Sequence, residues 1–322
     1  MRLYIRLHLR LTNFTGISLS GQSANYVLPL SREAEGDFKS HGVTYKFCLG
    51  CGHLNGRYSD TEEFFMELYF QENEIEYNSS AYLDEAFDAR ALEIYLPKVQ
   101  FLKDSIPSEG FSVLDIGCGA GHFVAACLEL GINATGIDVS KTSINFGNQN
   151  LSRRLTTCAL SYVNNENYID KILESQSTII SAIGVIEHIQ NLPRFFDAIR
   201  GSKAEYVYYS VPMASLSVLI ENIMPNLFPR QLSADHTHLF TEKSLTKLNQ
   251  LMRLTPVAEW RFGSDITDLL RSLSLTVQES GMTQTAHDFF MNPLTLMRDE
   301  LQTTLDQNHF CSEIHVLGRK EV

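Results

Sequence analysis

The chain has 322 residues, of which 44% are hydrophobic and 20% are charged. This composition predicts a globular protein with one large domain, or one domain with a small attachment. The 38 acidic and 26 basic residues give a net charge of -12. A negative field of this kind opposes binding to phosphate backbones, so we expect no nucleic acid as a substrate.

Cysteine usage and hydropathy favour a cytoplasmic protein. Of six cysteines, only Cys48 and Cys51 are close in sequence, which is not the pattern of a disulfide framework. No run of 18 apolar residues occurs, so we expect no membrane segment.

Apolar and polar side chains alternate over residues 3–11, which predicts a β-strand with one buried face. A transit peptide is the alternative, because no acidic residue precedes Glu33.

The first part of the chain divides into a cap and a leading helix. Residues 1–75 show no regular pattern, and we interpret them as an N-terminal cap segment that carries a single CxxC. Apolar residues recur at three- and four-residue steps over 79–103, which predicts a helix within a leading segment 76–108. The stretch SIPSEG then breaks that helix.

Strand and helix patterns alternate after Gly110. The expected strands are 111–117, 133–139, 159–163, 177–183 and 204–211, and the expected helices include 122–130 and 191–200. Gly131 stands where a helix C-cap is expected, and Ser140 where an N-cap is expected. Such alternation predicts βαβ units and a parallel sheet, and hence an α/β fold.

The C-terminal third predicts two more strands with a helical insertion between them. The strands are 255–263 and 312–320, and residues 264–309 have a mostly helical pattern. The sheet is therefore expected to close only at the C-terminus, within one domain over residues 76–322. An apolar, proline-containing segment covers residues 212–236.

A glycine-rich turn stands out in VLDIGCGAGHF, residues 113–123. Its glycines are Gly117, Gly119 and Gly121. This G-x-G-x-G differs from the dinucleotide fingerprint, because His122 stands where the third glycine of that fingerprint belongs. Asp115 precedes the turn, and its carboxylate would repel a pyrophosphate. The same carboxylate suits the ammonium group of S-adenosylmethionine, either directly or through water.

A second acid follows the next strand, in GIDVS, where Asp138 can accept protons from both ribose hydroxyls. Together, VLDIGCGAGHF and GIDVS resemble motifs one and two of class I S-adenosylmethionine-dependent methyltransferases. This resemblance implies a Rossmann-like, seven-stranded, mostly parallel sheet with helices on both faces. It also implies S-adenosylmethionine as the cofactor.

A third segment, SAIGVIEHIQN at residues 181–191, is similar to the fourth-strand motif of that family, in the E-H form common in sugar and ubiquinone-type methyltransferases. The resemblance implies that Glu187 and His188 face the substrate, and that residues 212–236 form a lid over the acceptor. The cofactor-binding residues that it implies are Asp115, Gly117, Cys118, Gly119, Gly121, Phe123, Asp138, Val139, Ile183, Gly184 and Val185. The family often has an acid near the adenine amine, and here Asn164, Asn165 or Glu166 takes that place.

Three histidines are candidate catalytic residues. His188 follows the fourth strand, and His236 and His238 lie in SADHTHLFT after the fifth. Histidine suits a general base that takes the proton of an acceptor hydroxyl near neutral pH. The alternative for each is a structural hydrogen bond. Asp235 and His238 are spaced like a metal pair but lack a third ligand, so we predict no catalytic metal.

The CxxC lies in YKFCLGCGHLNG and resembles one half of the zinc knuckle at the start of several sugar and polyketide-sugar methyltransferases. The other half is absent, with only His8, His41 and His53 as candidate replacement ligands. Bound zinc and packed thiols both remain open. The likeness links the N-terminal segment to enzymes that act on sugars.

The sequence thus predicts a cytoplasmic enzyme that transfers a methyl group from S-adenosylmethionine to a small molecule. The expected acceptor is a hydroxyl of a sugar or sugar-derived metabolite, as in polysaccharide biosynthesis. Three alternatives stand beside this hypothesis. They are a non-catalytic S-adenosylmethionine-binding protein, an NAD-dependent oxidoreductase with a variant turn, and an RNA methyltransferase.

Overall fold

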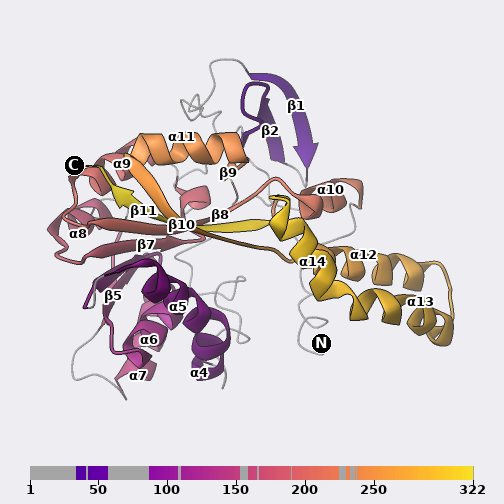
Figure 1. Ribbon diagram of the computed structural model, residues 1–322, viewed down its shortest axis with the longest axis horizontal. Coiled ribbons are helices and arrows are strands. Elements are labelled where there is room, and N and C mark those ends of the chain that lie inside the picture. The colour runs from indigo at the N-terminus through magenta and orange to yellow at the C-terminus, as the bar shows by residue number, and fades with distance from the viewer. Residues whose placement is uncertain are drawn as a thin grey trace.

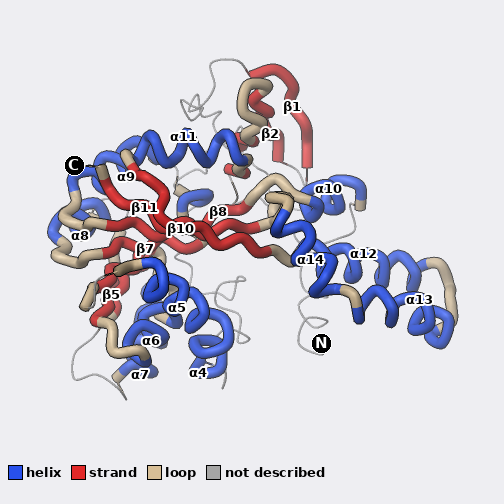
Figure 2. Tube along the Cα trace, in the orientation of Figure 1, coloured by secondary structure: helices blue, strands red, loops and turns tan. Residues whose placement is uncertain are grey.

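The structure is a computed structural model with one large sheet, one small sheet and flanking helices (Figures 1 and 2). It describes residues 34–40, 43–56, 87–107, 110–152, 159–164, 167–189, 191–224, 230–232, 236 and 238–321. Within these residues no helix is long and apolar enough to cross a membrane.

The large sheet has seven strands in the order β10-β11-β8-β7-β4-β5-β6. Its strands are β4 (Ser112–Ile116), β5 (Asn133–Asp138), β6 (Leu160–Tyr162), β7 (Ile179–Ile183), β8 (Tyr206–Pro212), β10 (Leu254–Phe262) and β11 (Glu313–Lys320). Strands β4 to β8 pair in parallel, and β11 pairs antiparallel with both β8 and β10. The predicted fold class is confirmed, including closure of the sheet by the last strand.

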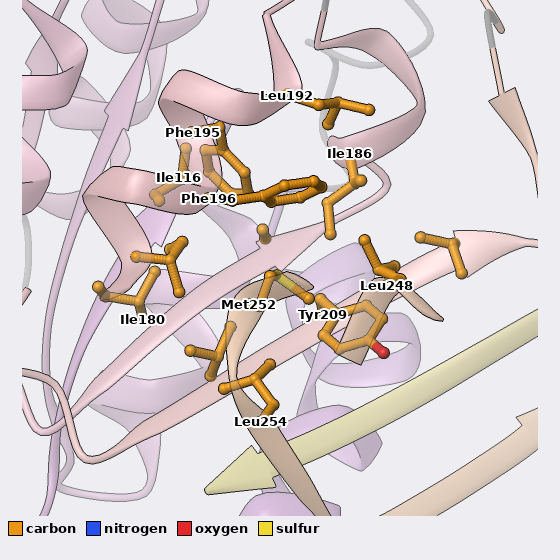
Figure 3. Packing of buried hydrophobic residues seen from close by; sticks show 14 of the residues in the cluster. Ile116, Ile180, Ile186, Leu192, Phe195, Phe196, Tyr209, Leu248, Met252 and Leu254 are labelled. Atoms are coloured by element: carbon orange, nitrogen blue, oxygen red, sulfur yellow. The ribbon is translucent and has the colours of Figure 1, made fainter. Parts of the chain in front are cut away.

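Helices cover both faces of this sheet (Figure 1). One face carries α4 (Phe87–Arg90), η3 (Ala91–Tyr95), α5 (Leu96–Ser105), α6 (His122–Glu129) and α7 (Lys141–Leu151). The other carries α8 (Tyr168–Glu174), α9 (Leu192–Gly201) and α11 (Glu242–Met252). On this second face Phe195 and Phe196 of α9 and Met252 of α11 pack against Ile180 and Tyr209 of the sheet (Figure 3).

The local signals that bound these elements behave as predicted. The Ser140 side chain accepts a hydrogen bond from the Ser143 N–H and caps α7. Gly131 has a left-handed φ of 74° just after α6. The leading helix differs from a regular α-helix, because η3 is a π-helical turn. Pro97 follows that turn and cannot donate to the carbonyl four residues before it, which gives the interruption a physical cause.

The N-terminal segment contains a small antiparallel sheet, so the expectation that it lacks regular structure is wrong for its described part. The sheet has the order β1-β2-β3-β9. Its strands are β1 (Ala34–Ser40), β2 (Val43–Cys48), β3 (Leu54–Gly56) and β9 (His238–Leu239). Because β9 comes from the chain after β8, the pairing of β3 with β9 joins the N-terminal segment to the large domain. The strand expected at 3–11 lies outside the described residues.

A helical arm fills the predicted insertion between β10 and β11. It consists of α12 (Asp265–Glu279), α13 (Gln284–Leu296) and α14 (Arg298–Gln307), and it projects from one end of the sheet (Figure 1). The described part of the predicted lid contains α10 (Leu216–Ile223), which packs against α12. The Ser217 N–H and hydroxyl donate to Asp265 and Asp268 at the base of the arm, at 2.9 and 2.8 Å.

Candidate active site

The glycine turn after β4 has a backbone that only glycine adopts easily. The φ angles of Gly117, Gly119 and Gly121 are 65°, 52° and 79°. A Cβ placed on Gly117 would lie 2.6 Å from the Val185 Cγ2, so this glycine lets the turn approach the loop after β7. A Cβ on Gly119 would meet nothing within 4 Å. Gly119 therefore borders open space, which fits a bound cofactor at that point.

Backbone hydrogen bonds join the turn to the end of β5. The Cys118 N–H donates to the Ile137 carbonyl at 3.1 Å. The Gly119 N–H donates to Asp138 Oδ2, and the Ser140 N–H donates to Asp138 Oδ1, both at 2.7 Å. Each carboxylate oxygen accepts one of these bonds and has further acceptor capacity. Asp138 therefore fits the predicted contact with two ribose hydroxyls.

Asp115 lies beneath the turn. Its side chain accepts a hydrogen bond from the Ser181 hydroxyl at 2.6 Å, and the residue is only 3% exposed. Burial, with a smaller contribution from the charge of Asp138, raises the pKa of Asp115 to about 7. A direct contact with the cofactor ammonium would need exposed surface that this residue lacks. The water-mediated form of the predicted contact stays a prediction, and in the structure Asp115 joins β4 to β7 through Ser181 beneath the site.

Two predicted contact residues turn out to face the protein interior. The Phe123 ring is 1% exposed and packs against the rings of Tyr95 and Tyr208, with centroids 6.4 and 5.9 Å away. The Cys118 side chain points toward Gly136, where an added Cβ would lie 2.7 Å from the sulfur. Phe123 is thus a core residue, and Cys118 contributes its backbone.

The loop after β7 meets the glycine turn. Gly184 has a φ of 64°, and its N–H donates to the Ser210 hydroxyl at 3.0 Å. Val185 contacts the Gly117 position, and Val139 packs at the edge of the same core. The ends of β4, β5 and β7 therefore meet at one place, where parallel α/β sheets bind their ligands.

The leading helix contributes residues that the sequence patterns did not reveal. The ring of His122, the first residue of α6, stacks on Tyr95 with a centroid distance of 5.7 Å and lies 4.6 Å from the Phe87 ring. Burial and the nearby Arg90 lower the pKa of His122 to about 4. Within the described residues, His122 Nε2 has no hydrogen-bond partner. The unpartnered Nε2 of His122, the nearby Arg90 guanidinium and the N-terminus of α6 together fit the carboxylate of a methionine group.

Asn164 is the one described candidate for the adenine contact. Its N–H donates to Asn167 Oδ1 at 2.8 Å, and its Oδ1 accepts from the Asn167 N–H at 2.9 Å. These two bonds close a local turn after β6. Asn165 and Glu166 lie outside the described residues.

The structure brings together two of the three predicted catalytic histidines. His188 lies in a short 3-10 helix, η4 (Ile186–His188), and its ring meets that of His236 edge-on at 4.8 Å between centroids. Ligand atoms of Glu187, His188 and His236 all lie within 4.8 Å of one another. Glu187 is buried, and the two histidines are partly exposed. We call these three residues the Glu187–His188–His236 cluster.

His236 is held by contacts from two directions. Its Nδ1 lies 3.1 Å from the Gln231 carbonyl, an acceptor, so Nδ1 carries the proton in the neutral ring. The Tyr45 hydroxyl of β2 donates to the His236 carbonyl at 3.2 Å. The proton on Nδ1 leaves Nε2 as the nitrogen that can accept a proton.

The lid supports the loop that leads to His236. The carboxylate of Glu221 in α10 is buried and accepts backbone N–H groups from Arg230, Gln231 and Leu232 at 2.7, 3.0 and 3.0 Å. Gln231 in turn holds His236. No feature of the sequence distinguished Glu221 from other acids in an apolar helix.

His238 does not join the cluster. It lies in β9, is 6% exposed, and its Nδ1 lies 3.2 Å from Nε2 of His53. The other nitrogen of His53 lies 3.2 Å from the Ser244 hydroxyl of α11. Burial lowers the pKa of His238 to about 3, so the ring is neutral near pH 7. His238 therefore joins the small sheet to the large domain, and Asp235, its proposed partner, lies outside the described residues.

In the described part of the chain, Cys48 and Cys51 are not part of a cluster of three potential metal ligands. The Cys51 N–H donates to the Cys48 sulfur at 3.4 Å, as in a tight turn, but His53 points to His238. His8 and His41 lie outside the described residues. Among the described residues, the set that could hold an ion is the Glu187–His188–His236 cluster. One carboxylate and two imidazoles suit a divalent cation, and this set shares no residue with the Asp235 and His238 pair considered in the sequence.

Comparison with known proteins agrees with this site. A family model described as a methyltransferase domain matches residues 85–258. The match spans more than half of the chain and includes the glycine turn, Asp138 and the Glu187–His188–His236 cluster. The chain belongs to this methyltransferase-domain family. This family assignment agrees with S-adenosylmethionine as the cofactor predicted from the turn.

Two curated relatives are both named for ubiquinone biosynthesis. The chain is 30% identical over 115 residues to the mitochondrial ubiquinone biosynthesis O-methyltransferase of Dictyostelium discoideum. It is 24% identical over 132 residues to the ubiquinone biosynthesis O-methyltransferase of Methylobacterium nodulans. The alignments cover 33% and 36% of this chain, and 36% and 51% of the relatives. The chain thus spans between a third and about half of these relatives.

Solved structures with similar folds have low sequence identity. One is a SAM-dependent methyltransferase from Archaeoglobus fulgidus, with a TM-score of 0.43 and 16% identity, covering 74% of this chain and all of the other. Another is the cyclopropane synthase MmaA2 from Mycobacterium tuberculosis, with a TM-score of 0.46 and 14% identity, covering 74% and 88%.

Proposed function

We propose that this methyltransferase moves the methyl group of S-adenosylmethionine to a hydroxyl oxygen of a small molecule. The observation that carries the proposal is the meeting of Glu187, His188 and His236 beside the cofactor loop after β7. Methyl transfer is a displacement at carbon, so aligning the acceptor with the methyl group is the main task of the site. A nearby base adds about 10²–10⁴-fold when the acceptor is a hydroxyl.

His236 is the residue that we assign as the general base. Its Nδ1 proton is held by the Gln231 carbonyl, so Nε2 can accept the hydroxyl proton. The acceptor oxygen bonds to the methyl carbon as the sulfur–carbon bond breaks. S-adenosylhomocysteine then leaves as a neutral thioether, and the proton is on His236. His188 lies edge-on to that ring and positions it.

The acceptor class follows from weaker features. The CxxC hairpin supports the sugar or sugar-derived acceptor that the sequence predicts. The names of the two relatives support a hydroxyl on an aromatic ring instead. Leu219 and Ile223 of the lid helix are 55% and 66% exposed, and this apolar surface is compatible with either class. A matched panel of nucleotide sugars, free sugars and catechols, with S-adenosylhomocysteine release as the readout, separates the two.

The catalytic assignment is tested with His236→Gln and His188→Ala. We expect His236→Gln to lower kcat by about 10²-fold or more, with the Kd for S-adenosylhomocysteine unchanged within about twofold. His188→Ala is expected to lower turnover more than cofactor affinity. His309→Ala is a matched control, because that imidazole is exposed and outside the cluster. Equal loss of turnover and cofactor binding would show that the two histidines are structural.

A second role for the same cluster has its own observation, the three ligand atoms within 4.8 Å. A bound divalent cation would polarise the acceptor hydroxyl there. Dialysis against EDTA, followed by addition of Mg²⁺, Mn²⁺ or Zn²⁺, distinguishes the two roles. Activity that survives chelation supports the base. Activity that is lost and then restored by one ion supports metal assistance, and calorimetric titration of that ion into Glu187→Gln checks the ligand set without an activity readout.

A further inference from the structure

The helical arm carries apolar surface that the rest of the described chain leaves exposed. Helix α14 has no buried residue, and α13 buries only Met291. The inward side of α13 holds Met291 and His287, whose Nε2 lies 2.9 Å from the Ser274 hydroxyl of α12. One side of α13 is therefore used for packing within the arm, and the other side is free for a different contact.

That other side is an apolar stripe. Phe289, Phe290, Pro293, Leu296 and Met297 recur at helical steps of one, four, seven and eight residues, which places them on one face. Phe289, Phe290, Leu296 and Met297 are 73%, 59%, 85% and 42% exposed. The two phenylalanine rings touch edge-to-face at 5.3 Å, so both lie on this face. The nine residues from 289 to 297 include no charged side chain.

The exposed apolar area is a large part of what a stable interface buries on each partner. With roughly 200 Å² per large side chain, the four exposed fractions give on the order of 500 Å² of apolar surface. Specific interfaces bury about 800 Å² per partner, so this stripe would supply more than half. Such a concentration on one helix face is typical of an interaction site and not of scattered surface residues.

Charge excludes two kinds of occupant. Residues 264–310 contain seven acidic and two basic residues, and the whole chain has a net charge of -12. Anionic lipid surfaces and nucleic acids carry their charge at the contact itself and would be repelled by this arm, whereas a second copy would meet the stripe with its own uncharged residues 289–297. The stripe itself is uncharged and apolar, so it fits a partner protein surface that is also apolar at its centre.

We infer that the occupant is a second copy of this chain, bound through α13 about a two-fold axis near Pro293. The stripe is complementary to itself when reversed, because two aromatic rings lie on one side of Pro293 and Leu296 and Met297 lie on the other. Antiparallel pairing places Phe289 and Phe290 of one copy against Leu296 and Met297 of its partner copy. Thioether and aliphatic groups pack well on aromatic rings, and a two-fold axis makes each contact twice.

The first test is the oligomeric state of the full chain by sedimentation velocity from about 1 to 100 µM. We expect a dimer with a micromolar dissociation constant. The double variant Phe289→Glu/Leu296→Glu is expected to be a monomer throughout this range. Leu173→Glu is the control, because Leu173 is a similarly exposed residue (41%) on α8 at the far end of the molecule. Unchanged S-adenosylhomocysteine binding in each variant shows that the fold is intact.

The second test checks the axis. Pro293→Cys places a thiol beside the two-fold axis, so we expect it to form a disulfide-linked dimer under mild oxidation. Leu173→Cys and the unsubstituted chain are the controls for random oxidation of the other cysteines. A wild-type monomer at all concentrations overturns the inference. So does a dimer that is insensitive to the two glutamates, or Pro293→Cys cross-linking no faster than Leu173→Cys.

Discussion

Gly117→Ala and Gly119→Ala form a matched pair of variants. They distinguish a loss of stability caused by tight packing from a loss of cofactor affinity caused by filling the space beside the turn. Both glycines have a left-handed φ, so each alanine costs about 1 kcal/mol in backbone energy. At Gly117 the added Cβ also lies 2.6 Å from the Val185 Cγ2, well inside ordinary contact. Overpacking of this kind adds about 1–3 kcal/mol. We therefore expect a loss of about 3 kcal/mol in unfolding free energy for Gly117→Ala and about 1 kcal/mol for Gly119→Ala.

Cofactor binding is expected to rank the two variants in the opposite order, because Gly119→Ala costs less stability but should weaken binding more. Its methyl group would enter the open space beside the turn, so the Kd for S-adenosylhomocysteine should rise by about tenfold or more. Urea unfolding gives the stability change, and calorimetric titration gives the affinity. Adding Val185→Ala to Gly117→Ala should recover part of the lost stability in a double-mutant cycle. Unchanged affinity in a folded Gly119→Ala would refute the assignment of that space to the cofactor.

Three further substitutions have expected outcomes. Asp138→Ala should weaken S-adenosylhomocysteine binding, because the ribose loses its carboxylate acceptor; calorimetry that shows wild-type affinity contradicts this role. His238, with a folded pKa of about 3 against 6.5 unfolded, should add stability that is present above pH 6.5 and falls with pH toward 3. His238→Phe should flatten the fall by about 1.4 kcal/mol per pH unit in urea melts at pH 4.5 to 6.5. Glu221→Gln should lower the free energy of unfolding by about 1.5–3 kcal/mol and also lower kcat, because the loop that holds His236 loses a charged acceptor. An unchanged kcat would show that Glu221 of the lid does not position His236.

Local features of the sequence were enough to predict most of the fold and the cofactor loops of the candidate site. The strand before Gly117, the acid after the next strand and the cap at Ser140 each depend on neighbours within a few residues, so the printed sequence shows them. The parallel sheet follows from the alternation of such units, because a short crossover helix allows few other arrangements. The cofactor loops meet for the same reason, since parallel strands bring their carboxyl ends to one edge.

Tertiary structure decided which side chains face that edge. His188 and His236 are 48 positions apart, and only the fold brings their rings to 4.8 Å. His238 is two residues from His236 but joins a two-residue strand, which is too short to leave a periodic signal in the sequence. Phe123 is two residues after Gly121, yet helix geometry directs its ring into the core. Side-chain direction and pairing between distant segments are properties of packing, so the sequence predicted which loops hold the cofactor, and only the folded chain showed which histidines come together beside them.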